Sequence, residues 1–137
     1  MAAHPIGGTW VVDPDIASEA ETPGLGIWTG DGIVTDPDGI AGSWEAVDGR
    51  TAVVTFADVF PDGTGYVAVR GPHVVDAAGE TWTSDYSYDV VAPDGTVLDS
   101  GTGTARGTRL LVEPMEKAGE PLAAMHAWEP AAATPAP

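Results

Sequence analysis

The stretch TWTSDYSYDVV, residues 81–91, decides the fold class of this chain. Its even positions are mostly aromatic, whereas its odd positions are mostly hydroxyl-bearing or acidic. Successive side chains of a β-strand point to opposite faces, so this alternation predicts a half-buried strand whose register is strongly set. The face expected to point inward carries Trp82, Ser84, Tyr86, Tyr88 and Val90.

The strand expected next, residues 98–112, carries small residues on one face. These are Gly101, Gly103, Ala105 and Gly107. Small residues opposite large aromatic ones suit the tapering interior of a closed barrel, and glycines permit the bends that closure demands. The alternative is that these glycines form bulges at a sheet edge.

Turn motifs divide the rest of the chain into short strands. The sequence PDGT occurs at 61–64 and again at 93–96, and DPDG occurs at 36–39. Proline presets φ and glycine accepts positive φ, so these motifs predict tight turns. The further strands are expected at 9–13, 25–29, 33–36, 40–47, 51–56 and 66–75. The sequence therefore predicts an all-β protein, an antiparallel up-and-down β-barrel of about eight strands.

One domain accounts for the length of the chain. We expect the barrel within residues 1–116, with a long first loop at 13–24, and a C-terminal extension at 117–137. Residues 117–128 could form a short helical turn. The segment from Glu129 onward is rich in alanine and proline and is expected to be disordered.

The charge is strongly acidic, with 5 Lys and Arg against 21 Asp and Glu and a net charge of −16. A nucleic-acid partner is not expected, because phosphates are neutralised by cations. A membrane partner is not expected either, since no apolar run approaches the ~20 residues of a membrane span. The chain has no cysteine. Cellular location stays open between the cytoplasm and, if a signal peptide once preceded the chain, secretion.

A Gly-x-Trp motif opens the first expected strand, as Gly8-Thr9-Trp10, and Arg109 falls late in the last one, with Arg106 as a second option. With DPDG at 36–39, these residues give the stretch from His4 to Glu113 a resemblance to bacterial lipocalin-like (calycin) β-barrel domains. The resemblance implies that the arginine packs over the tryptophan at the closed end of the barrel. Such a contact stabilises by roughly 0.5–2 kcal/mol. The chain departs from secreted lipocalins in having no cysteines and no clear C-terminal helix.

The aromatic stripe of residues 82–88 is the best candidate for a ligand site. An eight-stranded barrel is just wide enough to be filled by side chains or to hold one small ligand. The competing interpretation is plain core packing. The residues expected to line a lumen are Trp28, Val54, Phe56, Val67, Val69, Trp82, Tyr86 and Tyr88.

Metal and catalytic motifs are weak. The histidines His4, His73 and His126 lack the spacing of a metal site, so no metal and no cofactor is expected. A haem held by His73, which we place near a rim, or by His126 is the alternative. The acidic pairs Asp13/Asp15 and Asp36/Asp38 are expected in turns, and Glu45 is expected to be exposed, although burial would make it a general base. We expect no catalytic residue.

Three functions fit this pattern. The first is binding of a small apolar or aromatic molecule in the lumen by a monomer or small homo-oligomer. The second is a barrel cyclase or isomerase that templates ring closure largely by orientation. The third is a structural barrel with a filled core. A buried ionisable group facing the aromatic stripe would favour the enzyme.

Overall fold

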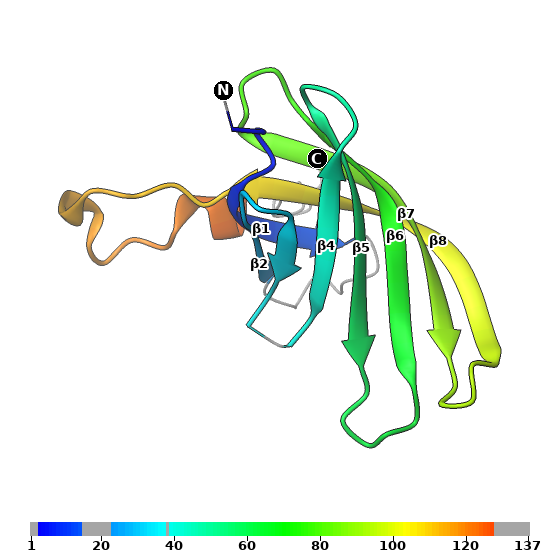
Figure 1. Ribbon diagram of the computed structural model, residues 1–137. Helices are drawn as coiled ribbons and strands as arrows, with labels where there is room; N and C mark the ends of the chain where they lie inside the picture. The colour runs from blue at the N-terminus through cyan, green and yellow to red at the C-terminus, as the bar shows by residue number, and fades with distance from the viewer. Residues whose placement is uncertain (1–2, 15–22, 38, 128–137) are drawn as a thin grey trace, which may run out of the picture.

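A computed structural model describes residues 3–14, 23–37 and 39–127 of the chain. Eight antiparallel strands follow one another around a closed barrel, and β8 pairs with β1 to complete the ring (Figure 1). The predicted fold class is confirmed. The strands are β1 (Gly8–Pro14), β2 (Gly24–Trp28), β3 (Ile33–Thr35), β4 (Ala41–Ala46), β5 (Thr51–Val59), β6 (Tyr66–Val75), β7 (Thr81–Val91) and β8 (Val97–Arg109).

The register of β7 against β8 places small residues opposite large ones. Trp82 lies opposite Gly107 and Tyr88 lies opposite Gly101. A Cβ atom at Gly107 would clash with the Trp82 indole, and one at Gly101 would come within 2.7 Å of the Tyr88 ring. The aromatic rings thus lean over the glycine backbone. The edge-bulge alternative is wrong, because pairing is continuous along these glycines and the barrel has no edge there.

Tight turns join the strands at alternate ends of the barrel. In the two PDGT turns, Gly63 and Gly95 have φ values of +76° and +91°, which glycine adopts without strain. The threonine two residues later donates to Asp62 and Asp94 from its hydroxyl group and from its backbone N–H, and these bonds lower the pKa of both carboxyl groups. The aspartates of these motifs are therefore turn residues.

One end of the barrel, which we call the plugged end, is filled by the N-terminal lead. Ile6 and Trp10 are fully buried there, and the Trp10 indole N–H donates to the Ile6 carbonyl at 2.8 Å. The guanidinium of Arg109 lies over the Trp10 ring, 4.2 Å from its centre. This is the contact that the Gly-x-Trp and late-arginine pattern implies, and it joins the first and last strands.

Arg109 also joins two backbone segments at the plugged end, the N-terminal lead and the turn before β7, by donating to three carbonyl groups. Its Nε donates to the carbonyl of Gly79, its Nη1 to that of Gly7 at 2.8 Å, and its Nη2 to that of Pro5. A Cβ at Gly8 would come within 2.6 Å of Nη1, and φ at Gly8 is +131°. Position 8 therefore requires glycine, because any side chain there would collide with the guanidinium group of Arg109. Arg106, the second option, instead pairs with Asp13 at 3.1 Å on the outer surface.

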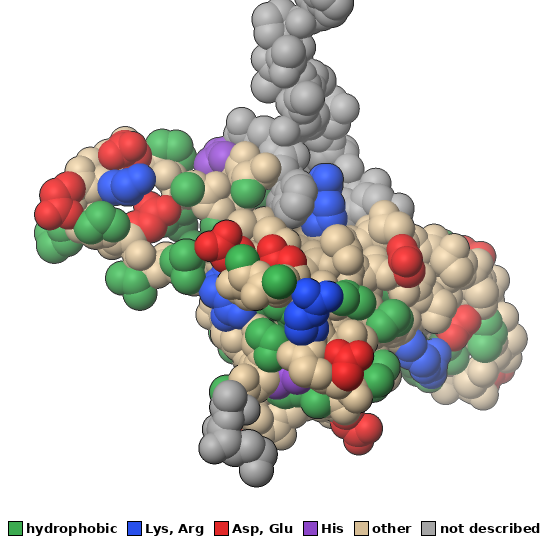
Figure 2. Space-filling model, turned by 90° about the horizontal axis from the view of Figure 1, so that it is seen from above, with side chains coloured by type: hydrophobic (Ala, Val, Ile, Leu, Met, Phe, Trp, Pro, Cys, Tyr) green, Lys and Arg blue, Asp and Glu red, His purple; other side chains and the backbone are tan. Residues whose placement is uncertain are grey.

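Two strand ends differ by three residues from the sequence-based expectation, and the other ends by at most one. β5 continues to Val59, and β8 ends at Arg109 rather than at Val112, which is fully exposed. Beyond β8 the chain projects from the barrel with two short 3-10 turns, Met115–Lys117 and Ala123–His126, where a helical turn was expected from residue 117. Figure 2 shows this projecting segment with hydrophobic and charged side chains intermixed. The expected disordered tail and most of the long first loop lie outside the described residues.

No helix among the described residues is long and apolar enough to cross a membrane.

Candidate functional site

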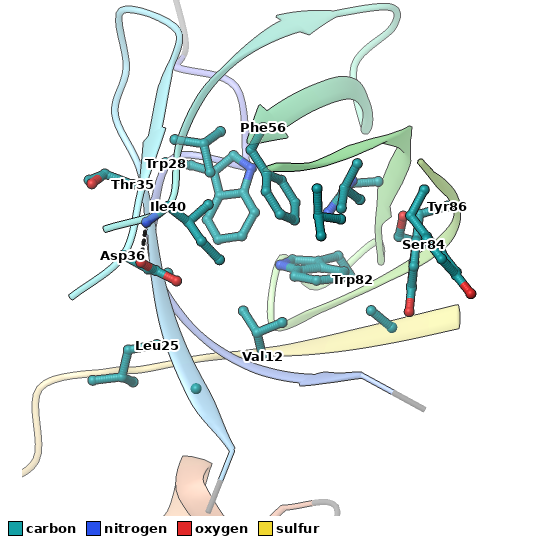
Figure 3. A pocket seen from close by; sticks show the side chains of 18 of the residues that line it. Val12, Leu25, Trp28, Thr35, Asp36, Ile40, Phe56, Trp82, Ser84 and Tyr86 are labelled. Carbon is teal, nitrogen blue, oxygen red and sulfur yellow. Dashed lines mark hydrogen bonds between the residues drawn. The ribbon is translucent and has the colours of Figure 1, made fainter. Parts of the chain in front are cut away.

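A cavity of about 600 Å³ occupies the barrel interior away from the plugged end. It reaches the end of the barrel at which β2 begins and β3 turns into β4. Side chains of Trp28, Phe56 and Trp82 extend into it from three different strands (Figure 3). Its lining is overwhelmingly apolar. It is lined by Val12, Pro23, Gly24, Leu25, Gly26, Trp28, Val34, Thr35, Asp36, Ile40, Phe56, Val67, Val69, His73, Trp82, Ser84, Tyr86, Tyr88, Val90 and Ala105.

The structure brings together all but one of the residues expected to line a lumen. Trp28, Phe56, Val67, Val69, Trp82, Tyr86 and Tyr88 border the cavity. Val54 does not. It is 2% exposed and points inward, but it belongs to the packed core opposite Trp44. Alternation along a strand predicts which side chains point inward, but it does not predict how deep each one lies.

Sequence reasoning missed lining residues on the short strands. Val12 and Val34 contribute to the cavity, as do Leu25 and Ile40 at its outer part. Val12 shares its face of β1 with Trp10, so alternation could have identified it. Alternation could also have identified Ser84 and Val90 as lining residues, because they lie on the inward face of β7.

His73 was expected near a rim, and this was wrong. It is 5% exposed and lines the cavity deep in the barrel. The inward alternation of β6 continues through Gly71 and Pro72, where pairing with β7 lapses and then resumes at His73 opposite Ser84. His73 is only two residues from the end of the expected strand, but this end of β6 is buried inside the barrel, where Val75 is fully inaccessible.

Three aromatic rings form the floor of the cavity, which we define as Trp28, His73 and Trp82 together with Ser84. The His73 ring centre lies 4.4 Å from that of Trp82 and 5.7 Å from that of Trp28. The two indoles are 5.6 Å apart in an edge-to-face arrangement. Both tryptophans and His73 therefore hold one another in position through ring contacts.

The floor carries buried polar atoms that make no hydrogen bond. They are Nε1 of Trp28, Nε1 of Trp82, Nδ1 of His73 and Oγ of Ser84. Among the described residues, Thr108 has the one other buried side-chain atom in this state. Leaving a polar group buried and unpaired costs about 1–3 kcal/mol. The residues of the floor thus leave several polar atoms unpaired in the packed layer beneath the cavity.

Burial controls the protonation of His73. Burial lowers the pKa of the imidazole from 6.5 to about 4. Hydrogen bonding to the backbone of Gly71 raises the pKa, but this effect is the smaller one. A pKa of about 4 leaves His73 neutral at neutral pH. A neutral imidazole offers one N–H donor and one nitrogen acceptor.

The remaining candidates lie outside the cavity or serve turns. His4 contacts the Asp48 carbonyl near the plugged end, His126 is exposed, and Glu45 is exposed as expected. Asp36 borders the cavity, but one of its oxygens accepts the Ile40 N–H at 2.8 Å within a turn. Asp15 and Asp38 lie outside the described residues. In the described part of the chain, no group of three or more His, Cys, Asp or Glu is placed to hold a metal ion.

Comparison of the chain with protein-family models, with curated proteins and with solved structures found no match. The fold and cavity therefore define the class of molecule. It is a closed, eight-stranded, up-and-down β-barrel with an apolar interior chamber.

Proposed function

We propose that this protein binds a small apolar or aromatic molecule inside the barrel. The observation that carries the proposal is the cavity of about 600 Å³ walled by aromatic and aliphatic side chains. Ligand pockets typically have volumes of about 300–1,000 Å³ with apolar walls and a few polar groups. A structural barrel with a filled core would leave no such chamber.

Fluorescence titration tests this proposal directly. Trp28 and Trp82 both border the cavity, so a bound guest should quench or shift tryptophan emission. The probe is N-phenyl-1-naphthylamine, an uncharged dye whose own emission rises in apolar surroundings. We expect saturable binding with little dependence on salt, because no charge pairing is involved. Unchanged emission of both dye and tryptophan across the titration would overturn the proposal.

We also propose that the barrel is of the lipocalin-like, calycin type. The support is the closed antiparallel order together with the stacking of Arg109 on Trp10 behind a Gly-x-Trp motif.

A barrel enzyme of the cyclase or isomerase kind is the second candidate, and His73 favours it. A buried ionisable group facing the aromatic stripe favours such catalysis, and the ring centre of neutral His73 lies 4.4 Å from that of Trp82. The imidazole could take a proton from a carbon next to a carbonyl and return it further along the chain of an unsaturated ketone.

Isomerisation of cyclohex-3-enone to cyclohex-2-enone, followed by ultraviolet absorbance, tests the enzyme. The reaction moves one proton and one double bond and needs no other reactant. Catalysis that rises with pH through about 4 and disappears in His73→Phe would support this candidate. A rate equal to that of buffer would count against it.

A further inference from the structure

We propose that the ligand carries a positively charged amino group on its apolar or aromatic body and places that group beside Asp36, at the end of the barrel where β3 turns into β4. This inference rests on the proposed binding function and specifies the charge of the ligand. It follows from three observations: the position of Asp36 in the cavity wall, the location of every lysine and arginine outside that wall, and the acidic surplus of the whole chain.

Asp36 forms part of the cavity wall and remains partly accessible. It is half-buried, and it comes directly after β3, in the turn that leads to β4. Figure 3 shows its side chain beside Ile40 at the margin of the chamber, on the opposite side from Tyr86. The outer end of a ligand whose apolar body occupies the interior would therefore meet this carboxylate.

The turn holds the Asp36 carboxylate in place. One carboxylate oxygen accepts the Ile40 N–H at 2.8 Å, and the backbone N–H of Asp36 donates to the Ile40 carbonyl at 3.2 Å. Exposed ion pairs are weak partly because two long side chains lose freedom when they form. Asp36 is short and already ordered, so this cost is reduced. Its negative charge attracts a cation whatever other hydrogen bonds its oxygens make.

The cavity wall contains no cationic side chain. The chain has five lysine and arginine residues, all of them among the described residues, and none of the five lines the cavity. They are Arg50, Arg70, Arg106, Arg109 and Lys117. His73, which does line the cavity, is neutral at neutral pH because burial lowers its pKa to about 4. The charge that the described lining residues present to a ligand is therefore that of Asp36.

The rest of the chain adds to this negative potential. It has 21 acidic residues against 5 basic ones and a net charge of −16. A field of this sign raises the local concentration of cations and repels anions before any contact forms. An apolar carboxylate would be repelled both by this field and by Asp36, and no cation in the wall would offset the cost of burying its charge.

Three naphthalenes that differ mainly in the charge of one group test the inference: 2-naphthylmethylamine, 2-naphthylmethanol and 2-naphthoate. Each is used to displace N-phenyl-1-naphthylamine near neutral pH, where the amine is protonated. We expect the amine to bind about fivefold more tightly than the alcohol, and the carboxylate to bind most weakly. No advantage of the amine over the alcohol, or tightest binding of the carboxylate, would overturn the inference alone. Failure of the dye and all three compounds to bind would overturn the proposed function as well.

Salt provides a second measurement that needs no variant. The range of electrostatic interactions falls from about 30 Å at ~0.01 M ionic strength to about 3 Å at ~1 M. The ratio of amine to alcohol affinity should therefore fall towards one as sodium chloride is raised. A ratio that is independent of salt would contradict an ionic interaction.

Two substitutions with the same change of net charge locate the interaction. Asp36→Asn keeps the oxygen that accepts the Ile40 N–H and removes the charge, so it should lose most of the preference for the amine. Asp85→Asn, on the exposed outer face of β7, is the matched control and should keep the preference. Retained affinity for the alcohol shows that each variant is folded. A preference that survives in Asp36→Asn, or falls equally in both variants, would contradict the role of Asp36.

Discussion

The plugged end and the cavity floor use the same kinds of side chain in opposite ways. At the plugged end, the Trp10 indole N–H donates to Ile6, and Arg109 donates to three carbonyl groups. On the floor, the indole N–H groups of Trp28 and Trp82 make no hydrogen bond. Both regions are deeply buried and rich in tryptophan. Burial alone therefore does not determine whether a polar atom is paired, and the two regions differ in that pairing and in the cavity that only the floor borders.

Trp10→Ala should produce the largest loss of stability in the molecule. It removes a fully buried indole, its hydrogen bond to Ile6 and the platform for Arg109, and we expect a cost of about 3–5 kcal/mol. Urea unfolding measures it. Tyr88→Ala, in the partly buried wall of the cavity, should cost clearly less. Equal losses at the two sites would remove the distinction between the regions.

Low pH should destabilise the folded barrel through His73. The folded pKa of about 4 lies below the ordinary value of 6.5, so the unfolded chain takes up a proton between these values while the folded barrel does not. Stability is fully present above about pH 6.5 and falls by about 1.4 kcal/mol per pH unit, to a total loss of about 3 kcal/mol near pH 4.

The measurement is urea unfolding at a series of pH values between 4 and 7. His73→Phe should remove this part of the pH dependence, and His126→Phe, on an exposed 3-10 turn, should leave it unchanged. If wild type and His73→Phe depend on pH alike in this range, the histidine is not buried in its neutral form.

Gly8→Ala tests how tightly the plugged end is fitted. The new methyl group would meet the Arg109 guanidinium, and φ at Gly8 is +131°, so we expect a loss of about 1–3 kcal/mol by thermal unfolding. Gly24 borders the cavity and has no heavy atom within 4 Å of an added Cβ. Gly24→Ala should leave stability nearly unchanged, and a comparable loss there would show that the cavity end is packed just as closely.

Tyr86→Ala should weaken binding of N-phenyl-1-naphthylamine by about tenfold, because it removes one aromatic wall of the cavity. Asp85→Ala, the adjacent position on the outer face of β7, is the control and should not change affinity. Dye fluorescence titration measures both. An effect of Asp85→Ala as large as that of Tyr86→Ala would place the dye on the outer surface.

Removal of the residues from Pro130 onward should have the smallest effect. The Ala- and Pro-rich composition of this segment offers little surface to bury, so the melting temperature should stay unchanged. These residues lie outside those that the structure describes. A clear fall in melting temperature, measured by circular dichroism, would show that composition misjudges the segment.

Alternation predicted the long strands better than any other element. The bounds expected for β6 and β7 match the structure, because turn residues flank each of these long strands. β8 was expected to continue to Val112, since apolar residues follow Arg109. The strand ends earlier because Leu110 makes the last backbone hydrogen bond to β1, at Thr9, and no strand lies beyond it.

The sequence predicted which side chains of the candidate site point into the barrel, but not how far along the barrel each one lies. The even positions of β7 identify one wall of the cavity, and the register with β8 follows from size complementarity. The boundary between packed core and open chamber depends on how rings from several strands meet, as Val54 shows. His73 was placed near a rim because it lies close to the end of β6, but that end of the strand is buried. Local sequence does not show which end of a strand is covered by the rest of the barrel, so the burial of His73 could not be predicted from its neighbours alone.

The pairing of β1 with β8 has a kinetic consequence. Seven of the strand pairs join neighbours in sequence, and each of these ladders can form as a local hairpin or meander. Closing the ring requires Asp13 to reach Arg106, which lies 93 positions further along the chain. The entropy of closing so long a loop is lost before its contacts form, so this step should set the height of the folding barrier. Once closed, the ring places the first and last strands side by side, so new chain ends could be opened at a turn such as 93–96 by circular permutation.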